Sequence, residues 1–282
     1  MGEHSFSGLQ TLRCDDLLSV VRGRHGWFLA NRHDAYIGAA LLMYGEYSEL
    51  EWHLLERMVF SDKDVIEVGA NIGTHSVPLA RKLSEIGRRL LVVEPQPVIF
   101  QSLCANLALN GLLNVSAENV ACSDAPGQLR FVEPDYRQPA NFGGVAMLEA
   151  AEAGRVVRCV RLDDIVPAEF DVGLIKIDVE GFEQKVITGA EKTIRRCRPF
   201  LYLENDRLEK SRALIEALWA LDYALWWHRP LLFNPNNYAG VAENVYGAVR
   251  SLNMLAIPRE IPAEIGGLTP VVDAAFHPLG SA

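Results

Sequence analysis

The sequence predicts an α/β fold, with a seven-stranded, mostly parallel sheet, helices on both faces and a hairpin at the C-terminal end. Short apolar runs with the length of buried strands alternate along the chain with segments in which apolar residues recur at helical spacing. Several of these runs lead directly into glycines or acidic residues. Because parallel strands end at the same edge of a sheet, this second observation predicts a ligand-binding crevice along that edge.

The composition limits the range of functions. The 282 residues, of which 49% are hydrophobic, are enough for one large domain or two small ones. A net charge of -9 argues against nucleic acid or an anionic membrane as a partner, since both need a basic face. The five cysteines are widely separated, which argues against a disulfide framework or a zinc site. With no apolar run near the roughly 20 residues that span a bilayer and no signal-peptide pattern, we expect a cytoplasmic protein.

The chain before the first strand of the sheet is less informative. Residues 1–35 are poorly periodic, and we expect an N-terminal extension ahead of a main domain at residues 36–282, with residues 26–31 as one arm of a small hairpin. A helix is predicted to begin at Ser48, because Ser48 and Glu51 match a capping box before an apolar run. We expect this helix to pack beside the first strand.

That first strand is predicted at residues 64–68, directly before a glycine turn and a helix. Gly69 and Gly73 let the backbone bend sharply and approach a ligand, while the start of the helix presents unpaired N–H groups. Asn71 stands where a dinucleotide pyrophosphate would require a glycine. The strand, turn and helix therefore predict a cofactor site, for which an NAD-dependent oxidoreductase is the weaker explanation.

A second strand, at residues 89–93, ends in Glu94 and Pro95. An acidic residue at the tip of this strand is placed to accept hydrogen bonds from both hydroxyls of a ribose. We therefore expect Glu94 to hold the ribose of a nucleoside cofactor.

The third strand is predicted near residues 115–120, where Asn119 and the backbone of Val120 are suited to binding an adenine edge. Asp124 could do this instead, and a polar turn without a ligand is the remaining explanation. Residues 125–165 contain no clear long helix, so we expect an insertion with two short paired strands and a loop between them. That loop either faces the substrate or is simply flexible.

Residues 172–177 form the predicted fourth strand, and three acidic residues follow at its tip. Asp178 and Glu180 concentrate negative charge where a cationic group of a ligand would lie, so we expect them at the reaction site. Helix capping is the alternative, and it suits Glu183 best. Lys176, within the strand, is either the buried ion-pair partner of these acids or a residue of the groove.

The fifth strand, at residues 200–203, ends in a second polar cluster made of Glu204, Asn205 and Asp206. Together with Asp178, oxygen ligands from this cluster could hold a divalent cation. The same groups could equally hold water and substrate.

The predicted sheet is completed by one helix and two strands, at residues 208–221, 223–227 and 253–257. Residues 228–238 are rich in aromatic and amide side chains, which suit a sugar or another polyhydroxylated acceptor. A packed connecting loop explains them equally well. His228 and His75 are candidate general bases, because histidine titrates near working pH.

Four phrases occur in this order along the chain: VIEVGANIG at residues 65–73, VEP at 93–95, NVACSD at 119–124 and IKIDVEGFE at 175–183. They resemble the signature of the FkbM family of S-adenosylmethionine-dependent methyltransferases, and the resemblance covers residues 36–257. It implies the class I methyltransferase fold, S-adenosylmethionine as the cofactor, and O-methyl transfer to a hydroxyl of a sugar, glycan or polyketide-like product. The first acid, often Asp in this family, is Glu67 here, which keeps the carboxylate with a slightly different reach.

The resemblance also implies roles for the candidate residues. Cofactor contacts are expected from Tyr47, Glu67, Gly69, Asn71, Gly73, Thr74, Glu94, Pro95, Asn119, Val120 and Asp178. Acceptor binding and proton removal are expected from Asp178, Glu180, Glu204, Asn205 and His228. A metal-dependent variant would use Asp178, Glu204 and Asn205 to bind Mg²⁺. An ordinary buried tyrosine is the alternative for Tyr47, and the sequence leaves a homo-oligomer open.

Overall fold

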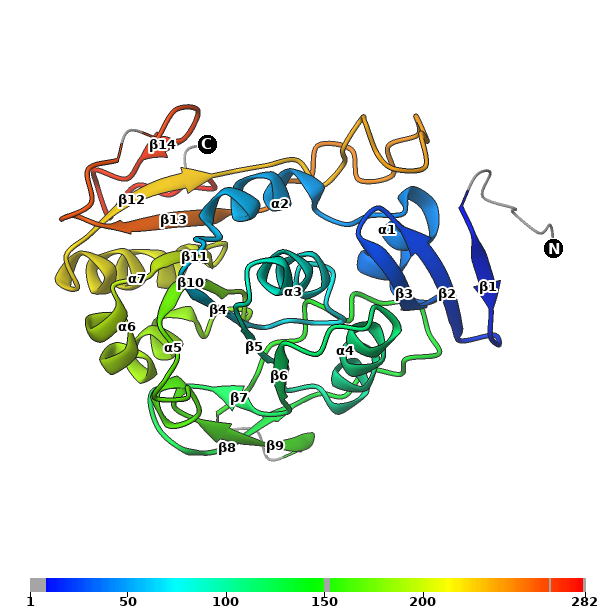
Figure 1. The fold of residues 1–282 in the computed structure, drawn as a ribbon, viewed down its shortest axis with the longest axis horizontal. Helices are drawn as coiled ribbons and strands as arrows, with labels where there is room; N and C mark the ends of the chain where they lie inside the picture. Colours follow the sequence, from blue (N-terminus) through cyan, green and yellow to red (C-terminus); the bar gives the residue numbers. More distant parts are fainter. Residues whose placement is uncertain (1–8, 150–152, 264, 281–282) are drawn as a thin grey trace.

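The computed structural model describes residues 9–149, 153–263 and 265–280. Its centre is an eight-stranded sheet in the order β14-β12-β13-β11-β10-β4-β5-β6 (Figure 1). These strands are β4 (Asp64–Val68), β5 (Leu90–Val93), β6 (Val115–Glu118), β10 (Val172–Ile177), β11 (Phe200–Glu204), β12 (Tyr223–His228), β13 (Asn253–Pro258) and β14 (Thr269–Pro270). The seven expected strands are confirmed, and β14 adds a short strand at one edge.

The strand directions place the loops that carry the candidate site at one edge of the sheet. Strands β11, β10, β4, β5 and β6 are parallel to one another, whereas β13 is antiparallel to both β11 and β12. The predicted C-terminal hairpin is therefore present. Every residue of β4 and β10 is buried, as expected for central strands that are covered on both faces.

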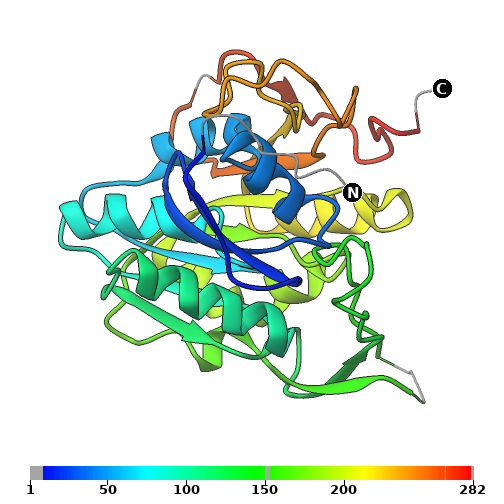
Figure 2. The ribbon, with the colours of Figure 1, turned by 90° about the vertical axis from the view of Figure 1, so that its right-hand side faces the viewer.

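Two layers of helices cover the sheet (Figures 1 and 2). One face packs against α2 (Glu49–Leu55), α3 (Ser76–Glu85) and α4 (Pro97–Leu109). The other face packs against α5 (Glu183–Gly189), α6 (Glu191–Cys197) and α7 (Leu208–Ala220). The predicted helix after the fourth strand is thus divided in two. It breaks beside Gly189, where an added Cβ would lie 2.1 Å from the carbonyl oxygen of Ser123.

The N-terminal part forms a separate three-stranded sheet that packs on the main fold. Strands β1 (Thr11–Arg13), β2 (Leu18–Gly23) and β3 (Gly26–Asn31) are antiparallel, so the expected hairpin arm is confirmed. Asn106, on α4, and Asn110, the C-cap of that helix, accept hydrogen bonds from the backbone of β3 at 2.6 and 3.0 Å. Helix α1 (Ile37–Tyr44) follows, and residues 1–8 of the expected extension lie outside the described residues.

A third sheet follows β6. It consists of β7 (Ala121–Cys122), β9 (Arg155–Val160) and β8 (Gly127–Phe131), and the expected pairing of the two short strands is confirmed by the antiparallel β8–β9 register. Between β8 and β9 the chain passes beside the N-terminal part, where the fully buried Phe142 packs in one cluster with Phe28 and Ile37. Residues 150–152 of the expected insertion lie outside the described residues.

The predicted capping box at the start of α2 is wrong. Ser48 adopts a left-handed conformation with φ of 51°, and its side chain makes no capping hydrogen bond. Glu51 accepts a hydrogen bond from the side-chain amide of Asn253 instead. This contact with a distant segment replaces the expected contact between Ser48 and Glu51. It turns the carboxylate of Glu51 toward the sheet. In the described part of the chain, no helix has both the length and the apolar character needed to cross a bilayer.

Candidate functional site

The glycine turn after β4 packs directly against the tip of β10. The N–H of Asp178 donates to the carbonyl of Val68 at 2.9 Å, which continues the ladder by one residue. Gly69 has a φ of +84°, and an added Cβ there would lie 1.8 Å from the carbonyl oxygen of Asp178. Any larger residue would therefore push the two strand tips apart. The turn thus fixes the position of Asp178 relative to the start of the site.

Glu94, at the tip of β5, is buried beside this turn. Its carboxylate accepts hydrogen bonds from the N–H groups of Asn71 and Gln96 at 3.0 and 2.9 Å. Burial raises the pKa of Glu94 to about 7, although the two hydrogen bonds act to lower it. Glu94 lines two adjoining cavities, one narrow and apolar and the other wider and polar. It therefore stands where the two halves of a nucleoside cofactor would meet.

The narrow cavity is an apolar slot of about 40 Å³ between the tips of β5, β7 and β10. Val120, Ala121, Val179 and Phe182 are among the residues that line it. Their side chains and backbone suit the faces of a flat base. Pro95 and Cys122 also line this slot.

The structure does not bring Asn119 and Asp124 into this slot. The side-chain amide of Asn119 turns back and donates to the carbonyls of Glu94 and Pro95, at 2.8 and 3.2 Å. Asn119 therefore braces the strand tip. Asp124 is exposed and accepts a hydrogen bond from the hydroxyl of Ser123 at 2.9 Å.

The wider cavity, about 370 Å³, lies over the carboxyl ends of β4, β10 and β11. We call it the acidic cavity, because seven carboxylates line it: Glu51, Glu67, Glu94, Asp178, Glu180, Glu204 and Asp206. Tyr47, Asn71 and Thr74 also line it. Gly143 and Gly144, from the loop between β8 and β9, line it too, so that loop reaches the site.

Lys176 is the buried cation of the acidic cavity. Its Nζ lies 3.2 Å from Oδ2 of Asp178 and 3.6 Å from Oε1 of Glu67, so the predicted ion pair is confirmed. Burial alone would lower the pKa of Lys176, but the carboxylates of Asp178, Glu67 and Glu51 raise it above its ordinary value. The same lysine partly offsets the burial that raises the pKa of Glu67. Glu67 also accepts a hydrogen bond from the hydroxyl of Ser76 at 2.6 Å.

Glu180 and Glu204 lie near Asp178 on the acceptor side of the cavity. One potential ligand atom from each of the three carboxylates lies within 4.8 Å of the others. Burial raises the pKa of Glu180 to about 7, despite an ion pair with Arg207. Burial and the charge of Asp178 also raise the pKa of Glu204. Its Oε2 is buried and has no hydrogen-bond partner among the residues that the structure describes. Glu180 and Glu204 therefore hold a proton more readily than an exposed glutamate does.

Two expected members of the site lie elsewhere. Strand pairing continues one residue past Glu204, because the N–H of Asn205 donates to the carbonyl of Leu252 at 2.7 Å. Successive side chains of an extended segment point to opposite faces, and the amide of Asn205 donates instead to the hydroxyl of Ser211 at 2.9 Å. Asn205 is not part of the acidic cavity and does not join Asp178 and Glu204.

His228 faces a different cavity, on the other side of the wall formed by Tyr202. Its Nδ1 lies 2.8 Å from the hydroxyl of Tyr202. Burial lowers the pKa of His228 to about 4. It is not placed to take a proton from a group bound beside Asp178.

The loop from residue 228 to 238 uses its amides for internal structure. The amide of Asn234 donates to Glu46 at 2.8 Å, and the amide of Asn237 donates to the carbonyl of Val241 at 2.7 Å. Both asparagines are buried. Within this loop, Leu232 lines the acidic cavity. The packed-loop explanation therefore accounts for the amides that the sequence offered as acceptor contacts.

The sequence reasoning did not assign Glu51 and Asn253 to the site. Both are buried, and the amide of Asn253 donates to Glu51 and to the hydroxyl of Tyr202, the latter at 2.8 Å. His75 is also buried in the cavity wall, with Nε2 3.9 Å from Oε2 of Glu51. Burial lowers the pKa of His75 to about 3, so it is neutral. The sequence signal that could have placed Asn253 in the site is a polar Asn at the start of an otherwise apolar strand.

The arrangement fits S-adenosylmethionine. The apolar slot suits the adenine, the buried carboxylate of Glu94 suits the ribose, and the acidic cavity beyond Gly69 suits the cationic sulfonium and amino groups. The parallel sheet, with its antiparallel hairpin and its glycine turn after β4, is the class I methyltransferase fold. The fold and the site together define a methyltransferase.

Comparison with known proteins specifies the family. The methyltransferase FkbM domain matches residues 67–225, more than half of the chain. The chain belongs to this family and is an S-adenosylmethionine-dependent methyltransferase of the FkbM type. It is 26% identical over 197 residues to the methyltransferase sdnD of Sordaria araneosa, covering 55% of this chain and 75% of that protein.

Two solved structures show a similar arrangement of the chain. The methyltransferase FkbM of Methylobacillus flagellatus KT is 15% identical, with a TM-score of 0.45 over 69% of this chain, which spans 44% of that structure's chain. The precorrin-6y C5,15-methyltransferase of Geobacter metallireducens GS-15 is 15% identical, with a TM-score of 0.45 over 74% of this chain and 88% of its own.

Proposed function

We propose that this protein is an O-methyltransferase that acts on a hydroxyl of a sugar, a glycan or a polyketide-like natural product. One observation carries the proposal: beside Gly69, a polar cavity of about 370 Å³ is lined by carboxylates, two of which have a pKa near 7. Carboxylates that can both accept and donate hydrogen bonds suit a polyhydroxylated acceptor. A pKa near the working pH suits a group that removes a hydroxyl proton.

The proposed roles follow from the positions of the side chains. When bound, S-adenosylmethionine supplies an electrophilic methyl group. Asp178, held by Lys176 and the Gly69 turn, orients the acceptor hydroxyl at the junction of the two cavities. Glu180 takes the proton, because its raised pKa matches working pH. Glu204, whose pKa is raised by burial and by the charge of Asp178, forms a hydrogen bond with a neighbouring oxygen of the acceptor.

The test separates cofactor binding from chemistry. S-adenosylhomocysteine should raise the melting temperature, and NADH should leave it unchanged. Labelled methyl groups from S-adenosylmethionine should then be incorporated into members of a panel of glycans, sugars and polyols. Asp178→Asn should lower turnover about 100-fold or more, as expected for a group that orients the reacting atom. Labelling confined to amine or carbon acceptors would contradict the proposal.

A metal-assisted version of the same reaction is the second candidate. It is favoured by the mutual approach of Asp178, Glu180 and Glu204 within 4.8 Å and by the partnerless Oε2 of Glu204. Glu180 takes the place that the sequence gave to Asn205. Mg²⁺ would lower the pKa of the acceptor hydroxyl in that version. If turnover survives exhaustive chelation and Mg²⁺ shows no calorimetric binding, the metal-free reaction holds.

A further inference from the structure

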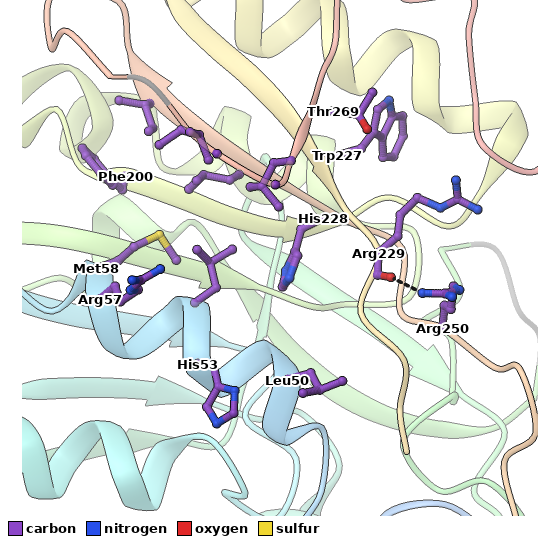
Figure 3. Close-up of a pocket in the computed structure, with 17 residues that line it drawn as sticks. Leu50, His53, Arg57, Met58, Phe200, Trp227, His228, Arg229, Arg250 and Thr269 are labelled. Carbon is purple, nitrogen blue, oxygen red and sulfur yellow. Dashed lines mark hydrogen bonds between the residues drawn. The ribbon is translucent and has the colours of Figure 1, made fainter. Parts of the chain in front are cut away.

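A second and larger cavity, about 900 Å³, lies on the other side of the wall formed by Tyr202 and Asn253. It opens between α2, with the 3-10 turn at Glu56–Met58, and the end of the sheet formed by β12 and β13 (Figure 3). Its walls are largely apolar and include Leu54, Met58, Phe200, Leu255 and Ile257. None of the expected cofactor residues lines it, so it is a separate binding volume.

The charged groups of this cavity are all basic. Of the 17 described residues that line it, three are arginines, Arg57, Arg229 and Arg250, and none is acidic. We call it the arginine-lined cavity. No ion pair holds any of these arginines within the described parts of the chain; Arg250 donates to the backbone carbonyl of Arg229 at 3.0 Å. In a chain with a net charge of -9, three arginines at one cavity, with no carboxylate among the described residues that line it, form a local positive field.

Figure 3 shows how the arginines are distributed. Arg57 lies at one side of the cavity and Arg229 with Arg250 at the other, and His228 lies between them. Arg57 therefore lies at one end of the apolar walls, and Arg229 and Arg250 lie at the other. An occupant that satisfies both features is an organic molecule with an apolar body and an anionic group.

The two cavities meet at a short hairpin stem. Leu231 bridges to Arg250, and the N–H of Ser251 donates to the carbonyl of Pro230 at 3.0 Å. Arg250, in the middle of this stem, lines both the acidic cavity and the arginine-lined cavity. Arg250 is therefore the residue at which the two cavities adjoin.

We infer that the arginine-lined cavity binds the part of the methyl acceptor that is remote from its reacting hydroxyl, and that this part is an apolar group bearing a phosphate, sulfate or carboxylate. That the bound group is part of the methyl acceptor rests on the proposed function. Recognition of the anion itself rests only on the arginines. The cavity thus selects an anionic, conjugated acceptor over a free neutral sugar.

The probes are 2-naphthyl phosphate, neutral 2-naphthol and inorganic phosphate, titrated into the full chain by fluorescence or calorimetry. Naphthyl phosphate should bind more tightly than either of the others, since only it satisfies both the arginines and the apolar walls. Arg57→Gln and Arg229→Gln should each weaken its binding about 5- to 20-fold and leave 2-naphthol unchanged. Arg158→Gln is the matched control, since Arg158 is also exposed but lies outside the cavity.

Three outcomes would overturn the inference: equal binding of naphthyl phosphate and 2-naphthol, equal binding of naphthyl phosphate and inorganic phosphate, or an equal loss in the Arg158→Gln control. The rise in melting temperature that S-adenosylhomocysteine causes tests the proposed function separately from this inference. If that shift is absent while naphthyl phosphate still depends on Arg57 and Arg229, the proposed function fails and the anion site remains. If the shift is present and the arginine variants bind naphthyl phosphate normally, the inference alone fails.

Discussion

The acidic cavity and the arginine-lined cavity share one residue, Arg250, and otherwise differ in nearly every physical respect. Seven carboxylates line the first, which has a volume of about 370 Å³. The second is larger, at about 900 Å³, and no carboxylate is among its lining residues in the described part of the chain. The first lies over the carboxyl ends of parallel strands, and the second lies beside the antiparallel hairpin. The sign of the charge around each cavity therefore depends on its position in the fold. It could not be predicted from the net charge of the chain.

We expect the largest effect from removing the buried cation that compensates the carboxylates of the acidic cavity. Lys176→Met should lower the free energy of unfolding by roughly 3 to 5 kcal/mol, because it leaves the buried carboxylate of Glu67 without a compensating charge. Urea unfolding measures the change. Lys192→Met, at an exposed lysine, should stay within about 0.5 kcal/mol of the parent. A loss at Lys176 no larger than this would show that the acids do not depend on the lysine.

The turn that supports the acidic cavity gives the next largest effect. Gly69→Ala should cost roughly 2 to 4 kcal/mol, because φ is +84° and the new Cβ would meet the Asp178 carbonyl at 1.8 Å. Gly87→Ala, at a φ of +69° in open space, should cost only about 1 kcal/mol. Thermal unfolding of the pair separates backbone strain from the clash. Equal losses would mean that the close approach of the two strand tips carries no energy.

Affinity for the cofactor distinguishes the two cavities by function. Glu94→Gln should weaken binding of S-adenosylhomocysteine about 10- to 100-fold, because it removes a charged acceptor at the junction of the slot and the acidic cavity. Glu118→Gln, at the end of the neighbouring strand β6, is the matched control and should bind normally. Isothermal calorimetry measures both. Undiminished binding by the Glu94 variant would remove the basis for placing the cofactor there.

The pH dependence of stability gives the smallest effect. Glu180 has an ordinary pKa of 4.5 and a folded pKa of about 7. As the pH rises from 4.5 to 7, the unfolded chain releases this proton while the folded chain retains it. The free energy of unfolding therefore falls across this window, and Glu180→Gln should reduce the fall by about 1 to 2 kcal/mol. Denaturant unfolding at pH 5 and pH 7.5 measures this, and an unchanged slope would contradict the raised pKa.

The local parts of the fold and site could be predicted from the sequence. The strands at β4, β5, β10 and β11 follow apolar runs of the expected length. The glycine turn directly follows the run of β4, and an acid stands at the tip of each of the other three. Lys176 could be paired with its acids because it lies within two residues of Asp178. In each case the residues that determine the structure are neighbours along the chain.

Other predictions failed where distant segments decide the contact. Glu51 was assigned to a capping box, but Asn253, 202 residues away, binds it. Asn205 was expected beside Glu204, although strand alternation turns it to the opposite face. That second error could have been avoided by extending the fifth strand one residue further.

The sequence by itself determined the parallel sheet, the glycine turn and the acidic strand tips, because apolar periodicity and turn chemistry act between residues that are close along the chain. Only the tertiary structure decided that Glu51 and Asn253 meet, that His228 faces away from Asp178, and that Arg57, Arg229 and Arg250 surround one cavity. The physical reason is that these side chains come from segments far apart in sequence, and the packing of α2 against the C-terminal hairpin sets which of them face each other.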